Sequence, residues 1–260
     1  MRCSEIIDRL EQYSPHTFAE SWDNVGLLAG RREKEVSSVM LTLDATKEVI
    51  EEAIRLEADM IISHHPMIFS PIKQVTDDDF VGERIVKLLR YDISYYAMHT
   101  NFDVMGMADA AADDLQLSDR HVLLVTFEED GATEGIGRTG TLPQTMKLSE
   151  CASFVKSVFR IPDVRVYGKL DREITTVAVC PGSGGGVTKQ AIDLQCDVLI
   201  TGDINYHTGI DAVAQGLCII DAGHYGIEKL FIPYMRDFIK REIPSIKIYT
   251  AEIKEPFVTL

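Results

Sequence analysis

Short apolar runs alternate with amphipathic stretches along most of this chain, and the alternation recurs. Apolar runs of strand length lie at 39–44 and 58–63, and an amphipathic helical stretch at 51–59 leads into the second run. The same series returns 138 residues later, at 177–182, 196–201 and 189–197. Alternating strands and helices predict an α/β protein. Any two βαβ units look alike to some degree, but the constant offset favours an internal duplication into two similar, interleaved α/β halves.

A third predicted strand completes each half, at 93–99 and 217–224, and each of these strands ends at a histidine, His99 or His224. Open α/β sheets bind ligands beyond the carboxyl ends of their strands. If the two halves face each other, these ends converge on one cleft. We therefore expect the functional site in a cleft between the halves.

Two adjacent histidines, His64 and His65, follow the predicted strand at 58–63, and Pro66 ends its ladder of hydrogen bonds. Imidazole is the commonest neutral metal ligand, and two neighbours in a loop can serve two adjacent points. Taken alone, the pair is also compatible with an exposed loop or one satisfied core histidine.

Two further positions offer carboxylates. His224 and Glu228 are spaced i, i+4 at the start of a predicted helix, so both side chains share one helical face and can reach one ion. The alternative is a solvent-facing polar pair, with Glu228 placed near the helix N-terminus for electrostatic reasons. Asp103 follows the third strand of the first half and supplies a second carboxylate.

The supporting residues are less determined. His99 can coordinate a metal, orient a ligand or carry a proton. Asp203 and His207 occupy the position that corresponds to the double histidine in the second half. We predict that Asp203 orients His207 or the nucleophile, with helix capping as the alternative for Asp203.

Two glycine-rich stretches call for different interpretations. The segment 135–140 has the spacing GxGxxG but lacks a preceding strand and a following helix, so it is no dinucleotide fingerprint. The segment 180–186 lies between a predicted strand and helix, where backbone amides can hold a phosphate, although a plain tight turn is the simpler interpretation. Together with Arg138, it is our candidate for holding an anionic substrate group.

The segment 21–30 follows a predicted N-terminal helix and carries Trp22, Asp23 and Asn24. A single tryptophan is most often a packing residue. The Asp-Asn-x-Gly pattern nevertheless predicts a shaped turn close to another feature.

Composition limits the possible functions. A net charge of −15 argues against sequence-independent nucleic-acid binding, which depends on Lys and Arg. No apolar run reaches the length of a membrane span, and the N-terminus lacks the apolar core of a signal peptide. Five scattered cysteines without a CxxC pair fit a reducing, cytoplasmic location.

These motifs together resemble one family, the toroidal dinuclear-metal proteins named after an NGG-interacting factor, whose bacterial members are called type 2 GTP cyclohydrolase I homologues. The matching segments are SWDNVGLLAG, ISHHPMIFSPIK, MHTNFDV, GIGRTG, TGDINYH and DAGHYGIEK. The resemblance implies two metal ions per chain, with Glu228 bridging them, and a ring-shaped homohexamer. The implied ligands are His64, His65, Asp103, His224 and Glu228. This set of imidazoles and carboxylates without thiolate suits Zn, Mn, Fe or Ni.

The resemblance also implies a domain plan: a first half at 1–127, a linker at 128–140 where longer relatives carry an inserted domain, and a second half at 141–260. The expected function is metal-dependent hydrolysis of a nucleotide or related small molecule, resembling GTP cyclohydrolase, with phosphoester hydrolysis as the nearer chemical alternative. His99, Asp203 and His207 are the catalytic candidates. The rival hypothesis is a non-catalytic metal-binding scaffold or partner-binding protein.

Overall fold

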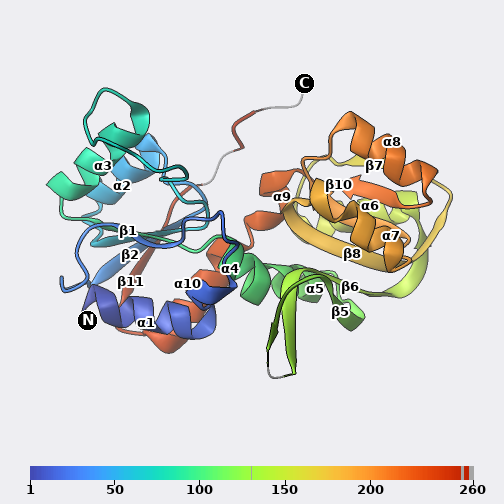
Figure 1. The fold of residues 1–260 in the computed structure, drawn as a ribbon, viewed down its shortest axis with the longest axis horizontal. Helices are drawn as coiled ribbons and strands as arrows, with labels where there is room; N and C mark the ends of the chain where they lie inside the picture. Colours follow the sequence, from blue (N-terminus) through green and yellow to red (C-terminus); the bar gives the residue numbers. More distant parts are fainter. Residues whose placement is uncertain (130, 253–254, 258–260) are drawn as a thin grey trace. The chain divides into compact units, whose positions relative to one another are not determined.

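The computed structural model describes residues 1–129, 131–252 and 255–257 as two compact units (Figure 1). Unit 1 comprises Met1–Phe102 and Phe231–Leu260, and unit 2 comprises Asp103–Leu230. These boundaries differ from the expected ones, because the end of the chain returns to the sheet of unit 1. The described residues of the expected linker at 128–140 instead belong to unit 2, mostly within two long strands, Ser118–Glu129 and Ala132–Lys147.

Unit 1 is built on a five-stranded sheet, in which β1 is antiparallel to β4 and the other neighbouring strands are parallel. The strand order is β1 (Gly26–Ala29), β4 (Ser94–Ala97), β3 (Met60–Ser63), β2 (Ser38–Thr42) and β11 (Lys247–Thr250). Figure 1 shows α2 (Lys47–Arg55) and α3 (Phe80–Arg90) on one face of this sheet, and α1 (Cys3–Tyr13) and α10 (Phe231–Glu242) on the other. The central strands β2, β3 and β4 are buried throughout, as expected for parallel strands covered on both faces.

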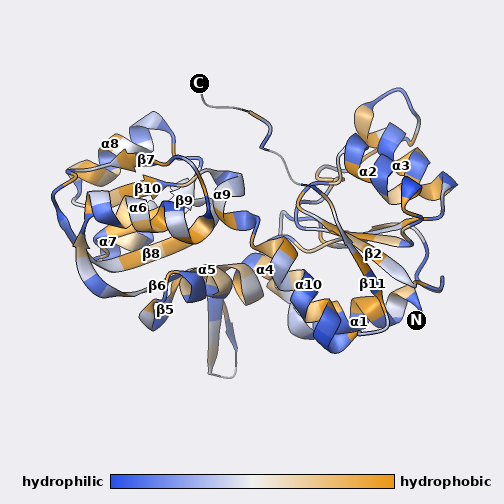
Figure 2. Ribbon diagram, turned by 180° about the vertical axis from the view of Figure 1, so that it is seen from behind, coloured by the Kyte–Doolittle hydropathy of each residue, from blue (hydrophilic) through white to orange (hydrophobic). Residues whose placement is uncertain are grey.

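Unit 2 contains a six-stranded sheet with three central parallel strands. The order is β5 (Ser118–Glu129), β6 (Ala132–Lys147), β8 (Glu173–Ser183), β9 (Val198–Gly202), β10 (Cys218–Asp221) and β7 (Arg165–Tyr167). Its helices are α5 (Ala108–Asp114), α6 (Leu148–Phe159), α7 (Thr188–Asp193), α8 (Tyr206–Ala214) and α9 (His224–Glu228). In Figure 2 the strands β8 and β10 are largely hydrophobic, whereas the helices carry both colours.

Alternate residues of β8 enter two separate cores, as the two-residue period of a strand requires. Val177 and Val179 pack with the residues of α6 on one face of the sheet. Ala178 and Cys180 pack on the other face, with residues of α7 and α8 such as Ala191. The sheet of unit 2 is therefore covered on both sides, as in unit 1.

The two units repeat a set of local contacts at the predicted offset of 138. In unit 1, Asp59 accepts hydrogen bonds from the backbone N–H groups of Ser37 and Ser38, at 2.8 and 3.0 Å. In unit 2, Asp197 accepts equivalent bonds from Thr175 and Thr176, each at 2.9 Å. In each sheet, a short antiparallel strand is also followed by three parallel strands in reverse chain order. The series is β1, β4, β3, β2 in unit 1 and β7, β10, β9, β8 in unit 2. These shared features support the internal duplication.

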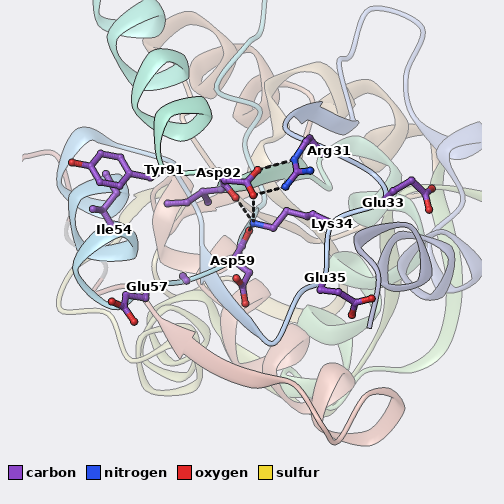
Figure 3. A pocket seen from close by; sticks show the side chains of 11 residues that line it. Arg31, Glu33, Lys34, Glu35, Ile54, Glu57, Asp59, Tyr91 and Asp92 are labelled. Carbon is purple, nitrogen blue, oxygen red and sulfur yellow. Dashed lines mark hydrogen bonds and ion pairs between the residues drawn. The ribbon is translucent and has the colours of Figure 1, made fainter.

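A pocket in unit 1 is lined by Asp59 and Asp92, which precede β3 and β4, whereas His64 and His65 follow β3 (Figure 3 shows the pocket). Lys34 is buried there, and its Nζ donates to the backbone carbonyls of Asp59 and Asp92. Arg31 forms a two-bonded ion pair with Asp92, at 3.0 and 2.6 Å. Both cations thus hold strand and loop ends together, which is a structural role.

Candidate metal centre

His64 and His65 are fixed by the end of β3. The backbone N–H groups of His64 and His65 donate to the carbonyls of Thr42 and Leu43, which continues the pairing with the β2 side of the sheet. The buried Tyr95 hydroxyl donates to the His65 carbonyl at 2.9 Å and accepts from the Met67 N–H at 2.7 Å. Burial raises the pKa of Tyr95 to about 12, so this hydroxyl keeps its proton at neutral pH. The loop carrying both imidazoles is therefore clamped on either side of Pro66.

Both imidazoles use Nδ1 to contact an acceptor. The Nδ1 of His64 lies 2.8 Å from the Met98 carbonyl, and the Nδ1 of His65 lies 3.0 Å from Oδ1 of Asp44. A carbonyl or carboxylate oxygen can only accept, so Nδ1 carries the proton and the lone pair of the neutral ring is on Nε2. This is the arrangement by which proteins orient metal-binding histidines.

His99 joins this pair at the end of β4. One ring nitrogen of His99 and one each of His64 and His65 all lie within 4.8 Å of one another, close enough to hold one metal ion. The Nδ1 of His99 donates to Oδ1 of Asp23 at 2.9 Å. We refer to His64, His65 and His99 as the histidine cluster.

Asp23 is a fully buried carboxylate that accepts several hydrogen bonds. Besides His99, its donors are the N–H and Oγ1 of Thr100, at 3.0 and 2.5 Å, and the N–H of Asn24 at 2.8 Å. Desolvation raises the pKa of Asp23, but the hydrogen bonds from His99 and Thr100 outweigh it and lower the pKa to about 2. Asp23 is therefore an anion that orients His99.

In unit 2, His224 and Glu228 form a second group on α9. The Nε2 of His224 lies 3.0 Å from Oε2 of Glu228, and its Nδ1 lies 2.8 Å from Oδ2 of Asp203. The Glu228 side chain is only 3% exposed. A carboxylate oxygen of Asp103 lies within 4.8 Å of one of Glu228. Asp103 opens a π-helical turn, Asp103–Met107, a helix variant found frequently at functional sites.

Two glycines make room for this group. A Cβ at Gly182 would lie 2.2 Å from Oε1 of Glu228, and the φ of Gly182 is +70°. A Cβ at Gly202 would lie 2.6 Å from the N atom of His224. The glycine-rich segment 180–186 thus has a steric role beside Glu228, in addition to connecting β8 to the helical turn that follows it.

Comparison with known proteins identifies the family. A family model described as Duf34/NIF3 (NGG1p interacting factor 3) matches residues 1–256. The chain belongs to this family. It is 33% identical over 261 residues to the GTP cyclohydrolase 1 type 2 homolog of Clostridium perfringens, with 99% of each chain covered. It is 36% identical over 230 residues to the protein of the same name from Clostridium acetobutylicum, with 88% of this chain and 85% of that one covered.

The fold agrees with this assignment. The crystal structure of a Bacillus cereus protein related to NIF3 has a TM-score of 0.90 to this chain, with 26% sequence identity. The match covers 100% of this chain and 99% of the other. The predicted α/β class and the predicted resemblance to the NIF3 family are both confirmed.

The donor set of this Duf34/NIF3 chain fits divalent transition metals. It offers imidazole nitrogens and carboxylate oxygens, which suit Zn, Mn, Fe or Ni. All five cysteines lie within the described residues, buried and outside any disulfide. Burial, reinforced by Asp103 and Glu228, raises the pKa of the nearby Cys180 thiol to about 12, so this thiol stays protonated. Among the helices formed by the described residues, none has the length and apolar character of a membrane span.

Two expectations about supporting residues differ from the structure. Arg138 is only 5% exposed, and its guanidinium is occupied by Asp109, Glu134 and backbone carbonyls, so it is not available to an anionic substrate. Its segment lies inside strand β6, which agrees with the rejection of a dinucleotide fingerprint. Asp203 contacts His224, whereas the expected roles for it were to orient His207 or the nucleophile, or to cap the following helix.

His207 itself is exposed on the first turn of α8, beside the ring of Tyr206. The cap of that helix is Asn205, whose side chain accepts from the Thr208 N–H. No sequence pattern indicates that Asp44 is the partner of His65 or that Asp23 is the partner of His99. The Asp-Asn-x-Gly pattern marked the position of Asp23, but its partner follows another strand, and a turn pattern carries no information about such a contact.

Proposed function

We propose that this Duf34/NIF3 protein binds two divalent transition-metal ions and uses them to hydrolyse a nucleotide or a related small molecule in the cytoplasm. The proposed ligands are His64, His65, Asp103, His224 and Glu228. The names of the curated relatives, GTP cyclohydrolase 1 type 2 homolog, support a nucleotide as the substrate class.

One observation carries the metal-binding part of this proposal. Each of the three proposed histidine ligands has its Nδ1 on a backbone carbonyl or an aspartate, the arrangement that orients a histidine to bind metal through Nε2, and the Nε2 of His224 lies 3.0 Å from Oε2 of the proposed ligand Glu228. Burial of His64 and Glu228 supports the same interpretation, since buried ionisable groups are normally paired or bound to metal.

Bound divalent ions would supply Lewis acidity and lower the pKa of water at the site. The chain itself would supply proton transfer. His99 is the best placed of the catalytic candidates, because Asp23 holds its Nδ1 proton and leaves Nε2 to accept a proton from attacking water. Asp203 would fix the orientation of His224. His207 stays a candidate for proton transfer to a leaving group from its exposed position on α8.

Elemental analysis of freshly purified protein tests the metal centre. We expect up to two transition-metal ions per chain, and loss of metal in the double variant His65→Ala, Glu228→Ala. The matched control is His121→Ala, Glu128→Ala, which removes an exposed histidine and an exposed glutamate of β5. Retention of both ions in the first variant would contradict the ligand assignment.

A screen of nucleotides and phosphoesters against Zn- and Mn-loaded protein tests the hydrolase. If His99 is the general base, His99→Ala should keep both metals and lower the rate about a hundredfold or more. The same measurement on His207→Ala decides between the two histidines. If no substrate is turned over by metal-loaded protein, the function is that of a non-catalytic metal-binding scaffold.

A further inference from the structure

Two exposed aromatic side chains lie beside the histidine cluster. Trp22 is 57% exposed and Phe69 is 55% exposed, and their ring centroids are 5.9 Å apart. The ring of His99 meets both, at 6.0 Å from Trp22 and 6.5 Å from Phe69. We refer to Trp22 and Phe69 as the aromatic pair.

Hydrogen bonds from neighbouring residues fix the aromatic pair in place. Asp23, next to Trp22, is anchored to His99 and Thr100. The side-chain amide of Asn24 donates to the carbonyl of Ile68, next to Phe69, at 2.6 Å. The loop bearing Trp22 is therefore tied both to the end of β4 and to the loop bearing Phe69.

Holding two aromatic rings exposed to water is unfavourable in free energy, and binding of a ligand would offset this. Exposed aromatic rings keep large apolar surfaces in water, and here they are held apart from the core by buried polar anchors. Small-molecule sites typically combine aromatic walls with a few placed polar groups, and the histidine cluster provides the polar groups. Aromatic side chains recognise planar heteroaromatic rings by stacking.

We propose that the aromatic pair is the binding platform for a planar heteroaromatic ring of the substrate, of the nucleobase type. The inference rests on the proposed function, because it places that ring beside the histidines that the hydrolysis would use. It adds two residues, Trp22 and Phe69, that determine which substrates bind.

The chain is well suited to a direct test, because Trp22 is its single tryptophan. Guanosine 5′-monophosphate is titrated into the full-length protein while tryptophan emission is recorded, once with metal present and once after chelation. Ribose 5-phosphate, which lacks the base, is the matched probe. We expect saturable quenching by the nucleotide and a flat response to ribose 5-phosphate.

Calorimetry on three variants locates the binding. Trp22→Ala and Phe69→Ala should each weaken nucleotide binding about five- to a hundredfold, the range that stacking of one base spans, and Trp22→Phe should retain most of the affinity. The control is Tyr91→Ala, which removes a 52% exposed aromatic residue preceding β4, in the pocket of Figure 3.

The following results would overturn the inference. Equal affinity in the wild type, Trp22→Ala and Phe69→Ala, or absence of quenching, overturns the inference. A changed oligomeric mass in Trp22→Ala, without nucleotide binding by the wild type, also overturns it and makes the pair a subunit contact. Metal content measured on the same samples separates the two proposals: stacking without metal binding rejects the proposed function, and metal binding without stacking rejects only this inference.

Discussion

Replacing Asp23 by Asn tests whether a buried carboxylate sets the state of His99. The Asp23 side chain is fully buried and accepts from His99, from Asn24 and from two groups of Thr100. An asparagine of the same shape has only one acceptor oxygen, and its NH₂ group faces groups that already donate. We therefore expect Asp23→Asn to lose stability and to change the tautomer of His99.

The magnitude follows from the pKa of Asp23. The pKa is lowered from 3.8 to about 2. At about 1.4 kcal/mol per pKa unit, the charged carboxylate contributes roughly 2 kcal/mol to the free energy of unfolding. Because the folded-state pKa is depressed, this contribution is present above pH ~4 and is lost as the pH falls towards ~2.

Urea unfolding of the metal-free protein at several pH values measures this contribution. The wild type should exceed Asp23→Asn by about 2 kcal/mol at pH 7, and the difference should fall to roughly half by pH 3. Nitrogen NMR of the His99 ring should show a protonated Nδ1 in the wild type. In the variant, the amide of Asn can donate to Nδ1, which moves the proton to Nε2.

Asp59→Asn is the matched control. Asp59 also accepts from backbone and hydroxyl groups, those of Ser37 and Ser38, but it contacts no histidine in the hydrogen bonds that the structure describes for it. That variant should lose stability and leave the His99 tautomer unchanged. If Asp23→Asn unfolds like the wild type and keeps Nδ1 protonated, Asp23 does not orient His99.

Gly182→Ala should displace the Glu228 carboxylate and weaken metal binding at least about tenfold in a competition assay, whereas Gly131→Ala, also at positive φ but with nothing within 4 Å of the new Cβ, should not. Arg138→Gln should lower the free energy of unfolding by about 3 kcal/mol, because Asp109 and the carbonyls around the buried guanidinium lose their donor; a loss below about 1 kcal/mol would contradict this role. We also propose a homohexamer, as the family resemblance implies, and light scattering that gives the mass of a single chain at micromolar concentration would reject it.

The sequence predicts three strands of each sheet, β2, β3 and β4 in unit 1 and β8, β9 and β10 in unit 2, because period and flanking helices are local signals; the other strands of the two sheets were not predicted. The predicted strand at 58–63 and the observed β3 at Met60–Ser63 end at the same histidine pair. The domain boundaries were not predictable in the same way. Phe231–Glu242 is amphipathic like other helices, and nothing local indicates that it packs in unit 1 with β11 beside β2.

The contacts of the candidate ligands are likewise predictable from the sequence only where they are local. The spacing of His224 and Glu228 correctly places both on α9, since i, i+4 neighbours share a helical face. The acceptors of the histidine Nδ1 atoms come from distant segments, such as Asp44 for His65. Arg138 illustrates the converse: its charge suggested an anion site, but burial among carbonyls and Asp109 gives it a structural role.

The offset of 138 residues relates equivalent positions in the two units, but equivalent positions carry different side chains. His99 and His224 both follow the third strand of their half, and each has its Nδ1 on an aspartate. In unit 2 that aspartate is Asp203, which corresponds at offset 138 to His65. In unit 1 this position is an imidazole, so the acceptor for His99 has to come from elsewhere, and Asp23 supplies it from the segment before β1. A position at the end of a strand can therefore carry either an imidazole or the carboxylate that orients one, and in unit 1 Asp23 is the carboxylate that orients His99, the third imidazole of the histidine cluster.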